Sequence, residues 1–369
     1  LIEMFKKSIA AISFLLSSAS ADLNQRFGSY LSGEQNVDSE VFEQIWTQFE
    51  EEFGEHNPNK LANEFERKNQ FALTLENVIG HNSDPAKTFT QGINQFSDMT
   101  EVQFREHFRL NGSGEEQHCS ATSQRQSVKK DFSLEDLPTN FDWRDHNGVS
   151  PVKNQGSCGS CWTFSTVGAL EAHSLVKYGS FDSLAEQQLV DCAGAYDNHG
   201  CNGGLPSHAF EYIAAAGGIS TEDSYPYFAV DHNCTVDSST FALNVVGGSI
   251  NITEGDESEL LHAIFEHGPV SIAFEVVDGF KDYKTGVYTS DVCKNGSGDV
   301  NHAVLAVGFG TDEETGLDYW VVKNSWGTAW GDQGYFKILR GSNMCGVAQC
   351  NSYPNDVLKL SVEEKLFMQ

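Results

Sequence analysis

Basic residues are scarce in this chain. Its 369 residues include 23 Lys and Arg against 52 Asp and Glu, which gives a formal net charge of −29 at pH 7. Nucleic-acid binding needs clustered positive charge, so this balance argues against a nucleic-acid partner and against binding to an anionic membrane surface. It suits an acidic compartment, where carboxylates are partly protonated and repel one another less.

The chain also lacks a long hydrophobic run. A transmembrane helix needs roughly 20 consecutive apolar residues, and the sequence contains no such stretch. The first residues instead show Lys6 and Lys7, an apolar stretch over 9–16 and the small residues Ala19-Ser20-Ala21. This order is typical of a secretory signal peptide. We therefore predict a signal peptide over residues 1–21 and no membrane anchor, with a short buried helix as the alternative.

Cysteines are present in odd number. Nine cysteines permit disulfides in an exported protein, but at least one thiol stays free unless another chain supplies its partner. A leftover thiol in an exported protein is a candidate nucleophile. Export also makes Asn-x-Ser/Thr triplets candidate glycosylation sites, and we expect glycans at Asn111, Asn251 and Asn295.

The apolar pattern predicts two kinds of structure along the chain. Helical spacing occurs over residues 41–52 and 61–82, followed by an extended piece over 88–96, a short helix from Thr100 and a polar linker over 111–136. From Leu137 onward the pattern predicts helices over 161–178, 185–192 and 205–216, then strands over 270–277, 303–309, 319–323 and 335–340. A helical part followed by a β part predicts an α+β fold of two lobes with a cleft between them.

The run from Gln155 to Trp162 carries the densest chemical signal. Cys161 stands where a Gly/Ser-rich loop enters a helix, and the free N–H groups there stabilise a thiolate. Gln155 supplies one donor to an oxyanion, and the Cys161 backbone N–H supplies the other. Cys158 and Cys161 also form a C-x-x-C, which leaves a redox pair or half a zinc site as alternatives. No second C-x-x-C or His pair offers further zinc ligands, so we predict neither a metal nor a cofactor.

A thiolate nucleophile needs a base. Of the 12 histidines, His302 stands out because it opens an apolar strand and so lies at a strand end facing the cleft. Asn324 ends another strand and is followed by Trp326. An amide that accepts a hydrogen bond from the imidazole fixes its tautomer, and an indole shields that bond from water. Nucleophile, base and orienting residue together are what covalent catalysis requires.

These residues resemble those of the papain-like cysteine peptidases. The run Cys158-Gly-Ser-Cys161-Trp162 is similar to that family's nucleophile motif, and Gly92-x-Asn94-x-Phe96-x-Asp98 is similar to its propeptide motif. The resemblance implies a helical left lobe and a β-barrel-like right lobe, preceded by an inhibitory propeptide over 22–136. It places the peptidase domain at 137–357 and leaves 358–369 as a tail of unknown role. We expect acid to loosen the propeptide as carboxylates such as Asp98 protonate.

The same resemblance implies roles for individual residues. It makes Cys161, His302, Asn324 and Gln155 catalytic, with Trp326 and Trp162 supporting them. It places Gly204 against the substrate backbone. It lines the second pocket with Leu205, Pro206, Ala273, Val300 and Ala303. It pairs the cysteines as Cys158–Cys201, Cys192–Cys234 and Cys293–Cys345.

Two segments resemble the cathepsin H group of that family. Residues 115–122 are similar to the mini-chain that this group retains from its propeptide, and residues 343–350 to the segment that holds it by a disulfide. A Cys119–Cys350 bridge leaves Cys161 as the one free thiol. Cleavage after Thr122 then tethers a carboxylate in the cleft, where it pairs with the α-ammonium of a substrate. Otherwise Cys119 is an incidental thiol of the propeptide.

The resemblance thus implies a zymogen whose mature form is an aminopeptidase with limited endopeptidase activity. A cathepsin L-like endopeptidase is the alternative, and a non-catalytic storage or binding protein on the same fold is another. We expect a monomer that acts on peptide or protein substrates in a lysosome or equivalent acidic vacuole, or after secretion. Protein inhibitors of cysteine peptidases are further expected partners.

Overall fold

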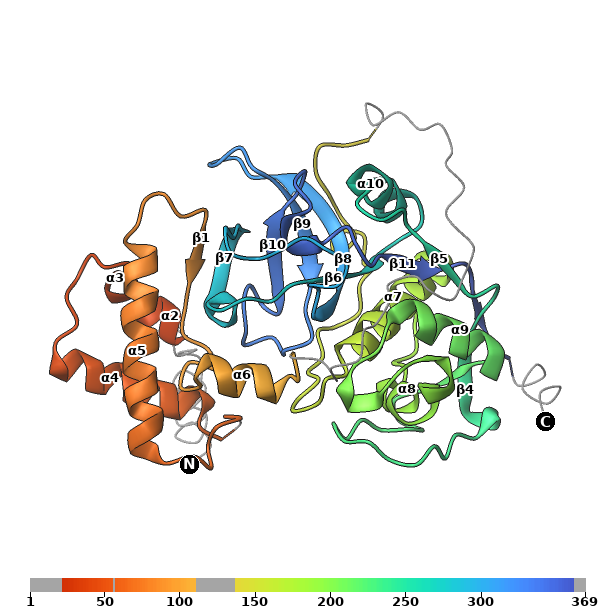
Figure 1. Cartoon of the computed structure of the whole chain (residues 1–369), viewed down its shortest axis with the longest axis horizontal. Coiled ribbons are helices and arrows are strands. Elements are labelled where there is room, and N and C mark those ends of the chain that lie inside the picture. Colours follow the sequence, from red (N-terminus) through yellow and green to blue (C-terminus); the bar gives the residue numbers. More distant parts are fainter. Residues whose placement is uncertain (1–21, 56, 111–136, 362–369) are drawn as a thin grey trace, which may run out of the picture. The chain divides into compact units, whose positions relative to one another are not determined.

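Figure 1 shows the fold in a computed structural model that describes residues 22–55, 57–110 and 137–361. The described residues form two compact units. The first comprises those within 22–85 and 92–98, and the second those within 86–91, 99–110 and 137–361. The division does not follow the predicted boundary between residues 136 and 137, because two earlier pieces, 86–91 and 99–110, belong to the second unit.

The first unit is helical. Its helices are α2 (Leu23–Arg26), α3 (Gly28–Leu31), α4 (Ser39–Phe53) and α5 (Glu64–Asn82). Helix α4 begins where the Asp38 side chain accepts hydrogen bonds from two main-chain N–H groups of the first turn, which satisfies donors that otherwise lack partners. Helices α4 and α5 cross (Figure 1), and buried aromatic side chains of both helices pack in one cluster. The buried rings of Phe49 and Phe71 lie 4.7 Å apart.

The motif Gly92-x-Asn94-x-Phe96-x-Asp98 is buried in the first unit. The Asp98 carboxylate accepts hydrogen bonds from Arg67 Nε at 2.6 Å and from Asn57 Nδ2 at 3.0 Å. Burial raises the pKa of Asp98, and Arg67 offsets this only in part. Because the folded chain then holds this proton more readily than the unfolded chain, a fall in pH does not unfold the unit through Asp98. The direction of this shift therefore does not support the expected acid-loosening role of Asp98.

Of the helices described in the second unit, all but the one over residues 257–266 occupy the predicted places to within two residues. The helices are α6 (Glu101–His107), α7 (Cys161–Tyr178), α8 (Glu186–Cys192), α9 (Pro206–Ala216) and α10 (Glu257–Glu266). Gly179 and Gly217 end α7 and α9 with φ of 67° and 88°, a left-handed conformation that glycine adopts without steric cost. Leu170, Leu189 and Ile213 of α7, α8 and α9 lie in one fully buried apolar cluster.

A nine-stranded sheet forms the rest of this unit. Its main path runs β1-β7-β10-β9-β8-β6-β11-β5, and β2 pairs with β8. The strands are β1 (Phe89–Gln91), β2 (Phe141–Asp142), β5 (Ser249–Asn251), β6 (Val270–Phe274), β7 (Tyr283–Tyr288), β8 (His302–Thr311), β9 (Asp318–Lys323), β10 (Tyr335–Leu339) and β11 (Ser352–Pro354). Strands β1 and β5 end the path without pairing with each other, so the described residues form an open sheet. The β-barrel-like lobe implied by the resemblance is not a closed barrel.

A second, three-stranded sheet explains part of the predicted tail. It is formed by β3 (Ile219–Ser220), β4 (Phe241–Val245) and β12 (Val357–Lys359) in the order β12-β4-β3. The main-chain N–H of Leu360 also donates to Ala242 O at 2.9 Å. Residues up to 360 are therefore part of the folded unit, and the domain does not end at residue 357 as predicted.

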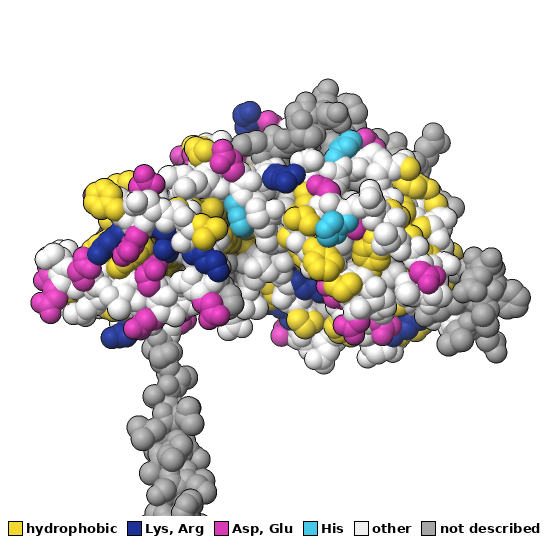
Figure 2. Space-filling model, turned by 90° about the horizontal axis from the view of Figure 1, so that it is seen from below, with side chains coloured by type: hydrophobic (Ala, Val, Ile, Leu, Met, Phe, Trp, Pro, Cys, Tyr) yellow, Lys and Arg dark blue, Asp and Glu magenta, His cyan; other side chains and the backbone are white. Residues whose placement is uncertain are grey.

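The surface agrees with the acidic composition. On the face shown in Figure 2, Asp and Glu side chains are scattered widely, and Lys and Arg side chains form no continuous patch. That face offers nothing like the clustered positive charge that a nucleic-acid backbone requires. Within the part of the chain that the structure describes, no helix is both long enough and apolar enough to cross a membrane.

Candidate active site

Helix α7 begins at the predicted nucleophile. Cys161 is its first residue, and the preceding Ser160 makes no side-chain cap. The thiol thus lies at uncapped main-chain N–H groups, at the end of a helix that favours negative charge. Among the described residues Cys161 is the only free cysteine.

Antiparallel pairing of β8 with β9 brings the predicted base and its orienting residue together. His302 is the first residue of β8, and Asn324 directly follows the last residue of β9. The start of one strand meets the end of the other, and His302 Nε2 lies 2.8 Å from Asn324 Oδ1. The next N–H along β8, that of Ala303, donates to Cys161 Sγ at 3.4 Å. The nucleophile therefore lies beside the start of the strand that carries the base.

Both predicted tryptophans are buried next to the site. The Trp326 ring stacks on the His302 ring with centroids 4.8 Å apart, a position from which it can shield the imidazole–amide bond from water. Trp162 supports the loop before α9. Its Nε1 donates to Gly200 O at 3.0 Å, and a Cβ added at Gly204 would lie only 2.6 Å from its ring. The chain at position 204 therefore passes too close to Trp162 for any residue but glycine.

Gln155 is the best-anchored residue of the site. It is fully buried, and its main-chain N–H donates to Ser325 O at 2.9 Å. Its side-chain Oε1 accepts from Ser325 Oγ at 2.7 Å, and its Nε2 donates to Cys158 O at 2.9 Å. An amide nitrogen carries two hydrogens, so a second one remains for an oxyanion.

Burial favours neutral forms of the two reacting groups in the described chain. It raises the pKa of the Cys161 thiol more than the surrounding main-chain N–H groups lower it. It also lowers the pKa of His302 to about 4, although the bond to Asn324 opposes this. A buried thiol beside a neutral imidazole is a weak nucleophile. A thiolate–imidazolium pair is thus not the form that this burial favours.

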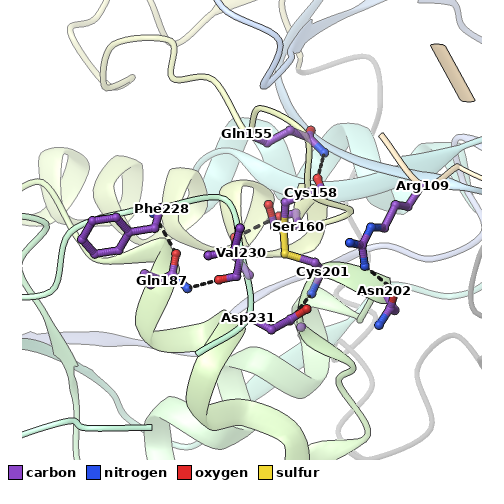
Figure 3. Close-up of a disulfide and its surroundings, with 12 residues drawn as sticks. Arg109, Gln155, Cys158, Ser160, Gln187, Cys201, Asn202, Phe228, Val230 and Asp231 are labelled. Atoms are coloured by element: carbon purple, nitrogen blue, oxygen red, sulfur yellow. Dashed lines mark hydrogen bonds between the residues drawn. A yellow bond between two sulfur atoms is a disulfide. The ribbon is translucent and has the colours of Figure 1, made fainter. Parts of the chain in front are cut away.

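Residues 99–110 pack beside the site within the second unit. Phe104 and Phe108 lie one helical turn apart, with ring centroids 5.2 and 4.9 Å from that of Trp326. Beyond them Arg109 Nη1 donates to Asn202 Oδ1 at 2.5 Å, a contact drawn in Figure 3. We did not predict these contacts, although the spacing of the two phenylalanines on a short helix marks a face that must be buried.

We expect Cys161 to react slowly with iodoacetamide at mildly acidic pH while residues 99–110 are in place. Once they are removed, water reaches the site and the pKa values of Cys161 and His302 return toward ones that allow a thiolate. We expect the alkylation rate at pH 6 to rise at least about tenfold, measured by mass spectrometry of the labelled chain. Equal rates before and after removal would show that burial by this segment does not control the thiol.

The structure contains the three disulfides that the resemblance implies. They are Cys158–Cys201, Cys192–Cys234 and Cys293–Cys345. The first, shown in Figure 3, ties the nucleophile loop to the loop before α9. It also rules out a C-x-x-C pair between Cys158 and Cys161. Cys350 is disulfide-bonded as well, whereas its expected partner Cys119 lies outside the described residues.

One of the predicted pocket residues contacts the thiol, and a second is its partner on the neighbouring strand. Ala273 of β6 is paired in register with Ala303 of β8, and Ala303 contacts Cys161. Val300 lies two residues before β8. These three positions therefore lie at the end of the sheet where β8 begins with His302.

The other pocket residues belong to the start of α9. Gly204 and Leu205 precede the helix and Pro206 is its first residue. The Leu205 N–H donates to Asn198 Oδ1 at 2.9 Å, which fixes the entry into the helix. Thr122, the predicted anchor for a substrate amine, lies outside the described residues.

The structure argues against one of the expected glycans. Asn251 is only 4% exposed and pairs with Ser352 inside the sheet, so a glycan there would prevent the strands from pairing. Asn295 is exposed and open to modification. Asn111 lies outside the described residues.

Two family models match the chain. The papain family cysteine protease model matches residues 137–355. The cathepsin propeptide inhibitor domain model matches residues 46–104. The second match extends into α6 and therefore includes Phe104, which lies against Trp326.

Individual relatives match both parts. Pro-cathepsin H of Medicago truncatula is 52% identical over 293 residues, which are 78% of this chain and 80% of the relative. Thiol protease aleurain of Arabidopsis thaliana is 49% identical over 297 residues, 80% of each chain. The solved structure of digestive procathepsin L2 proteinase from Tenebrio molitor larval midgut has a TM-score of 0.76 at 37% identity, covering 85% of this chain and 99% of that one.

Proposed function

The chain belongs to the papain family of cysteine proteases, and on that basis we propose that its mature form is a cathepsin H-type aminopeptidase with limited endopeptidase activity. The observation that carries the peptidase chemistry is the free thiol of Cys161 beside the bonded pair of His302 and Asn324. The family is made as a zymogen, and the inhibitor domain matches the region that includes the start of α6.

The proposed mechanism is acyl transfer through a thioester. His302 takes the proton of Cys161, and the thiolate attacks the substrate carbonyl carbon. Gln155 and the Cys161 N–H donate to the oxyanion. His302 then gives its proton to the departing amine, and Asn324 keeps the ring in place throughout. Water, deprotonated by His302, hydrolyses the thioester and restores the thiol.

Cys350 supports the aminopeptidase assignment. It is disulfide-bonded, and the three bridges between described residues account for six other cysteines. We propose Cys119 as its partner, so that residues 115–122 stay attached after maturation. The carboxylate of Thr122 then occupies the cleft on the side of residues that precede the scissile bond, where it excludes longer chains and binds an α-ammonium group.

A pair of substrates tests this assignment. We expect a fluorogenic amide of a single residue with a free α-amine to be cleaved at least about tenfold faster, in kcat/KM, than its N-acetylated counterpart, since the acetyl group removes a charge-assisted bond. Cys350→Ser should reverse the preference by releasing the tethered segment, and Cys119→Ser should match it. Non-reducing peptide mapping that found Cys119 free in active enzyme would contradict the tether.

An endopeptidase of the cathepsin L type is the second candidate. The likeness to a solved procathepsin L2 structure favours it. It predicts faster cleavage of the N-acetylated substrate by the unmodified enzyme and no effect of Cys119→Ser on that preference.

We also propose that the enzyme acts in an acidic vacuole or lysosome of the secretory pathway. The disulfides require an oxidising route, and the net charge of −29 is better tolerated where carboxylates are partly protonated. Localisation of a tagged full-length chain by microscopy, against markers of acidic organelles and of the medium, tests this assignment.

A further inference from the structure

A tyrosine side chain also holds the main chain of Gln155. Besides the contacts to Ser325 and Cys158, the main-chain oxygen of Gln155 accepts a hydrogen bond from Tyr227 Oη at 2.7 Å. The same tyrosine oxygen lies 2.5 Å from Ser160 Oγ. One hydroxyl therefore joins Gln155 to the residue immediately before the nucleophile Cys161.

The directions of these two bonds follow from the groups involved. A carbonyl oxygen only accepts, so the single proton of the Tyr227 hydroxyl goes to Gln155 O. The bond to Ser160 must then run the other way, with Ser160 Oγ donating to Tyr227 Oη. Burial raises the pKa of Tyr227 far above its usual range, so the hydroxyl keeps its proton at any working pH.

The Tyr227 side chain is fixed by packing. Its ring meets the ring of Phe164, on α7, edge to face with centroids 5.0 Å apart. The Tyr227 N–H donates to Glu222 Oε1 at 2.9 Å. Such a ring has little freedom to follow Gln155 or Ser160 if either moves, so it acts as a spacer between them.

The segment after Tyr227 is anchored to α8, as Figure 3 shows. The Phe228 N–H donates to Gln187 Oε1 at 2.9 Å, and Gln187 Nε2 donates to Val230 O at 2.7 Å. Asp231 Oδ1 accepts from the N–H of Cys201 at 2.7 Å, and Cys201 is the disulfide partner of Cys158 in the nucleophile loop. The loop that carries Gln155 and Cys161 is thus held to this segment by a path through that disulfide and by the Tyr227 hydroxyl.

We propose that Tyr227 is a positioning residue for the oxyanion site. Its hydroxyl fixes the distance between the Gln155 main chain and Ser160. The Gln155 main chain sets the position of the Gln155 amide, and Ser160 sets the position of the Cys161 N–H. The proposal rests on the mechanism above, in which those two groups stabilise the oxyanion. It does not depend on whether the enzyme is an aminopeptidase or an endopeptidase.

Tyr227→Phe tests the proposal because it removes the hydroxyl and keeps the ring against Phe164. We expect kcat to fall about tenfold, less than the roughly 10²–10³-fold of losing an oxyanion donor outright, with KM changed less than about twofold. The rate of Cys161 alkylation by iodoacetamide in the activated enzyme should stay unchanged, since that reaction forms no oxyanion. The substrate is whichever amide the unmodified enzyme cleaves fastest.

Tyr225→Phe is the matched control. Tyr225 lies in the same segment, and its hydroxyl donates to Asp191 Oδ2 at 3.0 Å, away from the two oxyanion donors. We expect this variant to keep kcat within about twofold. An equal loss of kcat in both variants would mean that Tyr227 only stabilises the fold, and would overturn the proposal.

A double-mutant cycle separates positioning from an independent effect. Gln155→Ala should lower kcat about 10²-fold, and adding Tyr227→Phe should lower it less than about twofold further, because the amide to be positioned is gone. A full tenfold loss in the Gln155→Ala background overturns the proposal. If Gln155→Ala alone left kcat unchanged, the oxyanion assignment itself would fail, and the proposal with it.

Discussion

Replacing Cys161 by serine is expected to lower turnover by a factor on the order of 10⁴ or more while the chain still folds. A serine hydroxyl is a far weaker acid than a thiol, so a nearly neutral imidazole cannot generate its anion. The substituted atom is similar in size and lies at the start of α7, and a serine oxygen can still accept the hydrogen bond that the Ala303 N–H donates to Cys161 Sγ. Turnover of the activated enzyme on a fluorogenic amide measures the effect.

The folding control for Cys161→Ser is the set of three disulfides together with the thermal unfolding midpoint. Both should match those of the parent chain. Cys161→Ala should lose activity equally, because neither replacement supplies a thiolate. Turnover within tenfold of the parent, with external protease excluded by inhibitors that spare the parent, would refute Cys161 as the nucleophile.

Acid activation of the precursor is the second large effect that we expect, and we assign part of its pH dependence to His107. Burial lowers the pKa of His107, at the end of α6, to about 4 from the ordinary 6.5. If α6 leaves the site, His107 regains its ordinary pKa. The released state therefore binds more protons than the folded precursor between about pH 4 and pH 6.5. A fall in pH through that window therefore favours release. His302, whose pKa is also about 4, acts in the same direction.

We expect the precursor to activate on the order of tenfold faster at pH 4.5 than at pH 7. Samples are taken during incubation at each pH and assayed at one fixed pH, so that titration of the mature enzyme does not enter. His107→Gln should flatten the dependence, leaving the part due to His302. His146→Gln, at an exposed position, should leave the pH dependence of activation unchanged. An unchanged pH dependence in His107→Gln would remove His107 from the explanation.

The catalytic residues were predictable because each one lies next to a local signal. Cys161 follows a Gly/Ser loop and opens a helix. His302 and Asn324 lie at ends of apolar strands, and antiparallel pairing of those strands places the ends together. Each of these predictions depends on only a few neighbouring residues. The observed ends of α7, β8 and β9 lie within two residues of the predicted ones.

Residues that act through distant contacts were not predictable in this way. Tyr227 lies in a segment without helix or strand, and nothing nearby in the sequence indicates that its hydroxyl reaches Gln155, 72 positions away. Asn251 carries an acceptable glycosylation triplet, and only the pairing of its strand with β11 shows that it is buried. Such facts depend on long-range pairing, which a local pattern does not encode.

The papain family model begins at residue 137, as the predicted peptidase domain does, but the two compact units divide the chain differently. Composition changes at Leu137, but residues 86–91 and 99–110 are grouped with the larger unit, which β1 joins by pairing with β7. The tail was missed because β12 is a short edge strand whose partner, β4, lies more than 100 residues earlier. Short strands carry too few residues for an alternation pattern to be recognised.

Strand β1 also determines what maturation exposes. It pairs antiparallel with β7, matching Phe89 with Gly286 and Thr90 with Thr285, and β7 has β10 as its only other neighbour in the described sheet. Removal of the propeptide takes β1 away and turns β7 into a free edge. The main-chain donors and acceptors along that edge are then unpaired and can form hydrogen bonds with another extended chain. The strand Tyr283–Tyr288 is therefore an inner strand of the sheet in the precursor and an edge strand once residues 89–91 are gone.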